Sequence, residues 1–132
     1  MTVQQHSTKR IEARTRESDV VAMPVPRQGE RPAAYADRVG EWYVSRKSAR
    51  HRKDHGLYLT PVPVADFMAV KIASRTGRVR VLDPAAGAGV LCCSAVESLV
   101  CRDLGPKHVE VVAFEIDQDL IAPLKAVLAY LV

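Results

Sequence analysis

The chain has 132 residues, of which 19 are Lys or Arg and 15 are Asp or Glu, and 48% are hydrophobic. This length allows a single folded domain and is small for a complete α/β enzyme. The opening residues lack the apolar core of a signal peptide, and no apolar run is long enough to span a bilayer. We therefore expect a cytoplasmic protein without a membrane partner.

The positive charge is concentrated in the first part of the chain. Residues up to Thr60 include 12 basic and 7 acidic residues, a net charge of +5, whereas the remainder has 7 against 8, a net charge of −1. Such asymmetry predicts that the first part contacts a polyanion. Three prolines interrupt the polar residues 1–32, which we interpret as a flexible arm.

A helix is predicted from Pro32 to Lys53 by the spacing of its apolar residues, with Trp42 and Tyr43 on the buried face. The domain boundaries that we expect are an arm over 1–32, a basic helix over 33–55 and a cofactor-binding part over 56–132. The end of the basic helix carries five candidate contacts for DNA phosphates: Arg46, Lys47, Arg50, Arg52 and Lys53. The alternative, equally open, is a solvated helix end whose cations suit the helix dipole.

No metal site is predicted from the sequence. His51 and His55 have no cysteine or acid at ligand spacing, and Cys92, Cys93 and Cys101 have the spacing of neither a zinc site nor a disulfide framework. We expect Cys92 and Cys93 to be small packing residues on a helix.

Alternating strands and helices are predicted in the second part of the chain. Thr60 and Pro61 begin a helix that we expect to bury Val64, Phe67, Met68 and Ile72 before it ends near Gly77. A strand over 79–83, a helix over 90–104, a strand over 109–114 and a helix over 118–131 follow. The second strand is apolar enough to be buried on both faces.

This order predicts the α/β class, and within it the start of a doubly wound, Rossmann-like parallel sheet. Two strands do not complete such a sheet. We therefore expect a truncated chain.

The strongest chemical signal is the turn from Asp83 through Gly87 and Gly89 into the next helix. Glycines at a helix N-terminus let a ligand approach the backbone amides. The dinucleotide fingerprint of NAD enzymes needs a third glycine where this chain has Cys92. An acid on the preceding strand suits the ammonium group of S-adenosylmethionine, which we favour over a dinucleotide or an empty turn.

Glu115 ends the second strand, where ligands bind in open parallel sheets. Its two carboxylate oxygens can accept both hydroxyls of a ribose, and Ile116 can lie against an adenine ring. The alternative role, a cap for the following helix, is the one that we favour for Asp117.

These segments resemble the amino-group DNA methyltransferases. Asp83–Gly89 is similar to their motif I, Glu115–Asp117 to motif II, and Gly56–Pro61 with the following Val64–Met68 to motif X. This order is that of the adenine-N6 group, which includes the modification subunits of restriction systems. The resemblance covers about residues 50 to 131. It implies S-adenosylmethionine as cofactor and double-stranded DNA as partner, with a specificity or restriction subunit as a further candidate partner.

The resemblance also implies individual roles. Thr60 would hold the methionine carboxylate with help from the backbone of Ala85, and Asp83 would hold the ammonium group. Gly87 and Gly89 would leave space for the cofactor beside the backbone, and Glu115 would bind the ribose. The cofactor-binding residues implied are Tyr58, Thr60, Asp83, Ala85, Gly87, Gly89, Glu115 and Ile116.

The sequence departs from this family in one respect. The catalytic Asn/Asp-Pro-Pro-Tyr/Phe motif, whose ring stacks on a flipped base, is missing, because the chain contains no Pro-Pro pair. We assign no catalytic residue, and expect weak cofactor binding and no methyl transfer by this chain alone. Two alternatives stay open: a methyltransferase for RNA or protein glutamine, and a non-catalytic module that binds nucleic acid or a partner.

Overall fold

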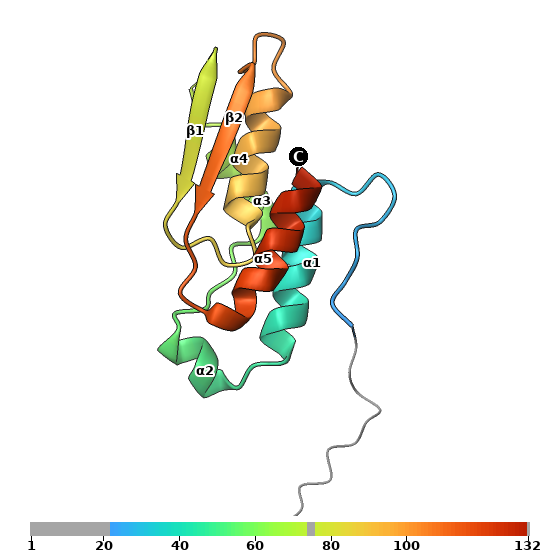
Figure 1. Ribbon diagram of the computed structural model, residues 1–132, viewed down its shortest axis with the longest axis vertical. Coiled ribbons are helices and arrows are strands. Elements are labelled where there is room, and N and C mark those ends of the chain that lie inside the picture. The colour runs from blue at the N-terminus through green and yellow to red at the C-terminus, as the bar shows by residue number, and fades with distance from the viewer. Residues whose placement is uncertain (1–21, 74–75, 132) are drawn as a thin grey trace, which may run out of the picture.

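The computed structural model describes residues 22–73 and 76–131 of the chain. In chain order the elements are α1 (Pro32–Ser45), α2 (Ala49–Asp54), α3 (Val62–Ala69), β1 (Arg78–Asp83), α4 (Val90–Val100), β2 (His108–Ala113) and α5 (Gln118–Leu131) (Figure 1). The alternation of strands and helices predicted after residue 78 is confirmed, with boundaries that differ by a few residues.

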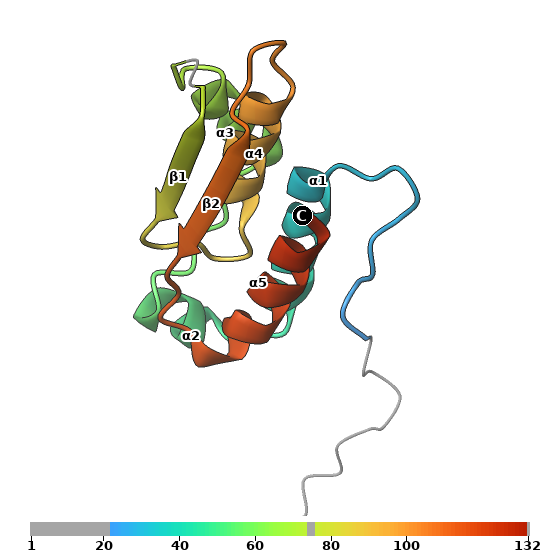
Figure 2. The same ribbon diagram turned by 45° about the horizontal axis from the view of Figure 1, so that its top comes forward.

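The two strands are parallel and hydrogen-bonded neighbours, paired from Arg78 with His108 to Asp83 with Ala113. Helix α4 makes the crossover between them. In both views α1, α3, α4 and α5 lie on one side of the sheet, and α2 lies beyond the carboxyl ends of the strands (Figures 1 and 2). A doubly wound sheet also has helices on its other face, so that part of the predicted fold class stays a prediction.

The core lies between α1, α4 and α5. Tyr35 and Val39 of α1, Cys93 of α4 and Val127 of α5 are fully or almost fully buried in one apolar cluster. The burial of Cys92 and Cys93 confirms that both are packing residues.

The predicted arm is attached to this core over its described part. Residues 1–21 of the arm lie outside the described residues. Among residues 22–31, the Arg31 guanidinium donates two hydrogen bonds to the Asp66 carboxylate and one to Glu97. The Glu30 carbonyl accepts a hydrogen bond of 2.7 Å from the Tyr130 hydroxyl. This part is therefore fixed to α3, α4 and α5.

The single helix predicted from Pro32 to Lys53 is two helices. Helix α1 ends at Ser45, whose hydroxyl donates a hydrogen bond to the Trp42 carbonyl. Ser48 then caps α2 by accepting a hydrogen bond of 3.1 Å from the His51 amide. Serine side chains that bond to nearby backbone groups favour caps over helix interiors, which explains the break.

The prediction for α3 was wrong about its buried face and its ends. Ala65 and Ala69 are buried against α4, whereas Phe67 is 64% exposed, and Val64 and Met68 are also exposed. Small alanines allow two helices to approach closely, which leaves the bulky side chains outside. The helix begins after Pro61, which is itself the N-cap, and ends at Ala69.

The expectation that β2 is buried on both faces was also wrong. His108 and Glu110 are exposed, and Glu110 forms an ion pair of 3.0 Å with Arg80, its register partner on β1. Val111 and Ala113 of β2 pack against Cys92 and Leu124, so the alternate residues of β2, which include Glu110, face away from the helices. In both views the described helices leave that face of the sheet uncovered (Figures 1 and 2). Within the described residues, no helix is long and apolar enough to cross a membrane.

Candidate functional site

The turn between β1 and α4 is organised by Asp83. This carboxylate is 8% exposed, accepts a hydrogen bond of 3.1 Å from the Ala85 amide and lies 3.3 Å from the Cys92 thiol, which donates to it. The turn continues the sheet, because the Phe114 amide donates to the Asp83 carbonyl and the Ala86 amide donates to the Phe114 carbonyl. The glycine turn is thus fixed to the end of β2 as well as β1.

The two glycines of the turn differ in their surroundings. Both have a positive φ, +56° at Gly87 and +96° at Gly89. A Cβ on Gly87 would meet no atom within 4 Å, whereas one on Gly89 would lie 3.1 Å from the Leu124 side chain of α5. Open space therefore lies beside Gly87. Beside Gly89 that space is filled by α5, so Gly89 allows close helix packing instead.

Glu115 connects the glycine turn to the start of α5. One carboxylate oxygen accepts a hydrogen bond of 2.8 Å from the Gly87 amide, and the other accepts one of 2.7 Å from the Asp117 amide. A carboxylate offers about four acceptor positions in total. Two backbone amides therefore orient Glu115 and leave acceptor capacity for the hydroxyl groups of a ligand.

A cavity of about 100 Å³ lies beside Glu115 and the open side of Gly87. Two large side chains at its edge are strongly exposed, Tyr58 at 84% and Ile116 at 75%. A smaller cavity of about 30 Å³ shares Tyr58, Ala85 and Gly87 and is also lined by Thr60. Exposed apolar groups around a few polar ones are typical of a ligand site.

These cavities bring together most of the predicted cofactor residues. Those that line one or both are Tyr58, Thr60, Ala85, Gly87, Glu115 and Ile116. Asp83 instead lines a separate apolar groove of about 320 Å³ between α3, β1 and α4, together with Met68, Leu82 and Pro84. His55 lines the Glu115 cavity and was not among the predicted residues.

Asp117 is the residue whose environment the sequence least predicted. It caps α5, as expected, through a hydrogen bond from the Asp119 amide to its side chain. It is also 3% exposed and accepts hydrogen bonds of 2.7 Å from the Tyr43 hydroxyl and the His51 ring. Burial tends to raise the pKa of Asp117, but these hydrogen bonds outweigh it and hold the pKa below its ordinary value.

The pKa of Tyr43 is shifted in the opposite direction from that of Asp117. Burial, together with the hydrogen bond to Asp117, raises the pKa of the Tyr43 hydroxyl to about 12. Tyr43 was predicted to be a core residue, and its burial confirms this. No local sequence signal joins it to Asp117, since the two residues are 74 positions apart.

The thiols next to the turn offer no nucleophile. Burial raises the pKa of Cys93 to about 12, and burial together with the nearby Asp83 raises the pKa of Cys92 still further. Both thiols therefore stay protonated near neutral pH, which is the unreactive form.

The predicted DNA-contacting residues have unequal environments. Lys47 is 19% exposed and forms an ion pair of 2.6 Å with Asp119, and Arg46 lies over the Trp42 ring at 4.7 Å. On α2 the side chain of Arg50 reaches Asp54 at 3.5 Å and is mostly exposed, and Arg52 and Lys53 are also exposed. Among the five predicted contacts, Lys47 is therefore mostly covered, whereas Arg46 and the three cations of α2 are exposed.

Comparison with known proteins gives one result. The family model described as N-6 DNA methylase matches residues 35–122, which span α1 to the start of α5 and include the glycine turn and Glu115. No curated protein and no solved structure matches the chain.

Proposed function

The chain belongs to the N-6 DNA methylase family, and we propose that it binds S-adenosylmethionine in the cavity beside Gly87 and Glu115. The observation that carries this proposal is the placement of Glu115. Its carboxylate is fixed by the Gly87 and Asp117 amides at the carboxyl end of β2, next to an open space over Gly87.

The residues around this cavity fit the parts of that cofactor. Glu115 would accept hydrogen bonds from the ribose hydroxyls, and the exposed side chains of Tyr58 and Ile116 would cover the adenine. Thr60, at the adjoining cavity, would hold the methionine carboxylate together with the backbone of Ala85. Asp83 lines the neighbouring apolar groove, which shares Pro84 with this cavity, and from there it would balance the charge of the ammonium group.

The cofactor supplies an activated methyl group, and the function of this chain's residues is to bind and orient it. We propose that the acceptor is the exocyclic amine of adenine in DNA, in keeping with the family. Such a transfer depends on alignment and electrostatic support more than on a strong base. Because the sequence has no Pro-Pro pair to hold the base, we propose that this chain provides the cofactor site and not the acceptor site.

The domain boundaries follow from this proposal. The part from Gly56 onward would carry the cofactor, and the helical segment over 33–55 would lie toward DNA, with the exposed cations of α2 near the phosphates. A specificity or restriction subunit remains a candidate partner of this arrangement.

The experiment is a titration of the ¹⁵N-labelled chain with S-adenosylmethionine, followed by amide NMR. The amides of Gly87 and Asp117 both donate to Glu115, so their resonances should shift on binding. Replacement of Glu115 by Ala should weaken binding by at least about tenfold, since a ligand hydroxyl loses a charged acceptor worth about 1.5–3 kcal/mol. Asp83→Asn, which removes the charge opposite the ammonium group, should weaken binding as well.

The matched control is Glu110→Ala, which removes an exposed acid from β2, the strand that ends just before Glu115. It should leave the affinity unchanged. No shift at Gly87 in the wild-type chain, or equal affinity of the Glu115→Ala variant, would favour a non-catalytic nucleic-acid or partner-binding module instead.

A further inference from the structure

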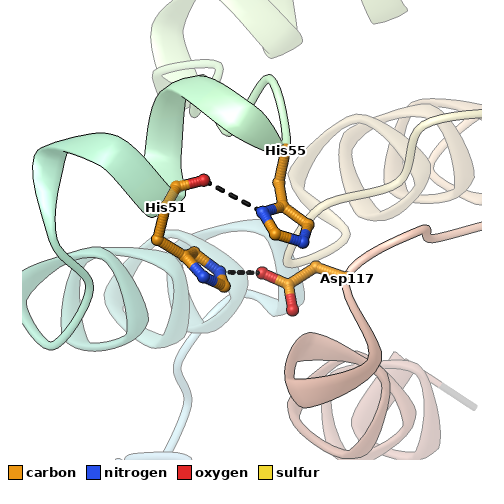
Figure 3. Close-up of side chains that lie close together, drawn as sticks. All are labelled: His51, His55 and Asp117. Carbon is orange, nitrogen blue, oxygen red and sulfur yellow. Dashed lines mark hydrogen bonds and ion pairs between the residues drawn. The ribbon is translucent and has the colours of Figure 1, made fainter.

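Three potential metal ligands lie together at the end of α2. His51 is in α2 and His55 follows its last residue, while Asp117 comes from the turn between β2 and α5 (Figure 3). One ligand atom from each of the three residues lies within 4.8 Å of the other two. His51 and the C-cap residue His55 are four positions apart, and such residues share one face of a helix, so both imidazoles lie near Asp117.

The His55 ring is held by a hydrogen bond to the backbone. Its Nδ1 lies 3.0 Å from the His51 carbonyl oxygen, which only accepts hydrogen bonds. A proton on Nδ1 satisfies this contact, and in that neutral tautomer Nε2 is the nitrogen available to a metal ion. Histidines that bind metals commonly donate their other ring N–H to a backbone carbonyl in this manner, which fixes the tautomer and the ring.

His51 and Asp117 already have the separation of two ligands on one ion. The His51 Nε2 atom lies 2.7 Å from Asp117 Oδ2. Two ligand atoms that are each about 2 Å from a Zn²⁺ ion lie about 3 Å apart. A bound ion would replace the proton that Nε2 shares with the carboxylate, and a small separation of the two groups would admit it.

The Asp117 carboxylate is held in place by outer partners. The Tyr43 hydroxyl donates to Oδ2 at 2.7 Å, and the Asp119 amide donates to Oδ1 at 3.2 Å. Hydrogen bonds of this kind orient ligating carboxylates in metal sites. They also hold Asp117 in a buried place, where a cation gains from reduced screening.

We propose that His51, His55 and Asp117 form a binding site for a divalent transition-metal ion such as Zn²⁺, with water completing the coordination. Two imidazole nitrogens and one carboxylate are ligands that suit zinc and its neighbours, whereas Mg²⁺ and Ca²⁺ prefer oxygen alone. The ion would attach α2, a six-residue helix with no buried residue, to the start of α5. Helices this short are not stable by themselves, so an anchor at this place has a structural purpose.

The test uses the full chain, treated with a chelator and titrated with Co²⁺ and Zn²⁺ without any cofactor. We expect one ion per chain, and a visible Co²⁺ spectrum without the intense near-ultraviolet bands of thiolate ligation. His55→Ala should weaken binding by at least about tenfold, the lower end of the loss seen when even an outer partner of a metal ligand is removed. This variant should fold, because His55 is exposed; circular dichroism verifies that.

Two control variants test whether the metal ion binds at this site or at another histidine or thiol of the chain. His108→Ala removes an exposed histidine at the start of β2 and should not change the affinity. Cys101→Ser removes the exposed thiol and should also have no effect. Asp117→Asn is the second test variant, since it keeps the shape of the side chain but removes its charge, and should reduce the affinity as well.

The proposal is overturned if His55→Ala binds Zn²⁺ as tightly as the wild-type chain, or if Cys101→Ser abolishes binding. Because no cofactor is present in this titration, failure of the metal site leaves the proposal for S-adenosylmethionine unaffected.

Discussion

The Glu115 carboxylate accepts a hydrogen bond of 2.8 Å from the backbone amide of Gly87, which lies 28 residues earlier in the chain. This contact joins the end of β2 to the turn after β1, and the other carboxylate oxygen holds the Asp117 amide. One side chain thus fixes the backbone on both sides of the proposed cofactor cavity. Unfolding experiments measure what the Glu115 side chain contributes to stability, and cofactor titration measures what it contributes to binding.

Replacement of Glu115 by Gln should destabilise the chain by about 1–3 kcal/mol. The amide NH₂ of Gln cannot accept a hydrogen bond, so one of the two backbone donors, at Gly87 or at Asp117, loses its partner. Urea unfolding measures the free energy of unfolding. Glu110→Gln is the control, because it removes only an exposed ion pair worth at most about 1 kcal/mol. Equal losses in the two variants would contradict a special role for the Glu115 contact.

The two glycines of the turn should respond differently to alanine. Gly89→Ala places a Cβ 3.1 Å from the Leu124 side chain at a φ of +96°, so crowding and backbone strain act together. We expect a loss of about 2–4 kcal/mol in unfolding free energy. Gly87→Ala has the backbone strain alone and should cost about 1–2 kcal/mol, while its methyl group enters the open cavity and weakens binding of S-adenosylmethionine. Thermal unfolding and cofactor titration of both variants distinguish the two effects; a Gly87→Ala variant less stable than Gly89→Ala would reverse the assignment.

The order of elements and the glycine turn could be predicted because local signals define them. Apolar runs gave both strands, and α5 was predicted with its observed bounds, Gln118–Leu131. The turn at Gly87 and the acid at Glu115 could be recognised because each lies within a few residues of the end of a strand. Their proximity follows from parallel pairing, which brings the carboxyl ends of both strands to the same edge.

The features that the sequence did not predict depend on contacts between distant segments of the chain. Periodicity showed that Val64, Phe67 and Met68 share a face of α3, but not that Ala65 and Ala69 are the residues that pack against α4. The sequence could not indicate that His51 meets Asp117, since 66 positions separate them. The break between α1 and α2 had a local signal in Ser45 and Ser48, which the basic run around them obscured.

The stability that Asp117 contributes should decline in acid. Its pKa is held below the ordinary value in the folded chain by the Tyr43 and His51 hydrogen bonds, against the effect of burial. The folded chain therefore holds this proton less tightly than the unfolded chain, and the contribution is complete above the unfolded pKa of about 4 and is lost as pH falls below it. Glu30 acts in the same direction, because its hydrogen bond with Arg38 lowers its pKa to about 2. Comparing the wild-type chain with the Asp117→Asn variant separates the contribution of Asp117 from that of Glu30.

We expect the difference in unfolding free energy between the wild-type chain and Asp117→Asn to be larger at pH 6 than at pH 3. Urea unfolding at a series of pH values measures this difference. A difference that stays constant over this range would show that Asp117 titrates alike in the folded and unfolded chain.

The cations of α2 should determine how DNA binding responds to salt. Arg52 and Lys53 have exposed side chains, whereas the Lys47 ammonium group is paired with Asp119 at 2.6 Å and is mostly covered. If Arg52 and Lys53 contact phosphates, each releases a counterion from DNA. Arg52→Ala and Lys53→Ala should then each reduce the slope of log affinity against log salt concentration by about 0.9.

Fluorescence anisotropy with a labelled duplex, repeated at several salt concentrations, gives these slopes for the full chain. Lys47→Ala is the matched control, because it removes the same unit of charge from a side chain that Asp119 already neutralises, and we expect little change in its slope. A decrease with Lys47→Ala as large as that with Arg52→Ala would mean that the pair with Asp119 opens when DNA binds. Unchanged slopes in all three variants would place the DNA contact elsewhere, and the basic run of α2 would then be a solvated helix end.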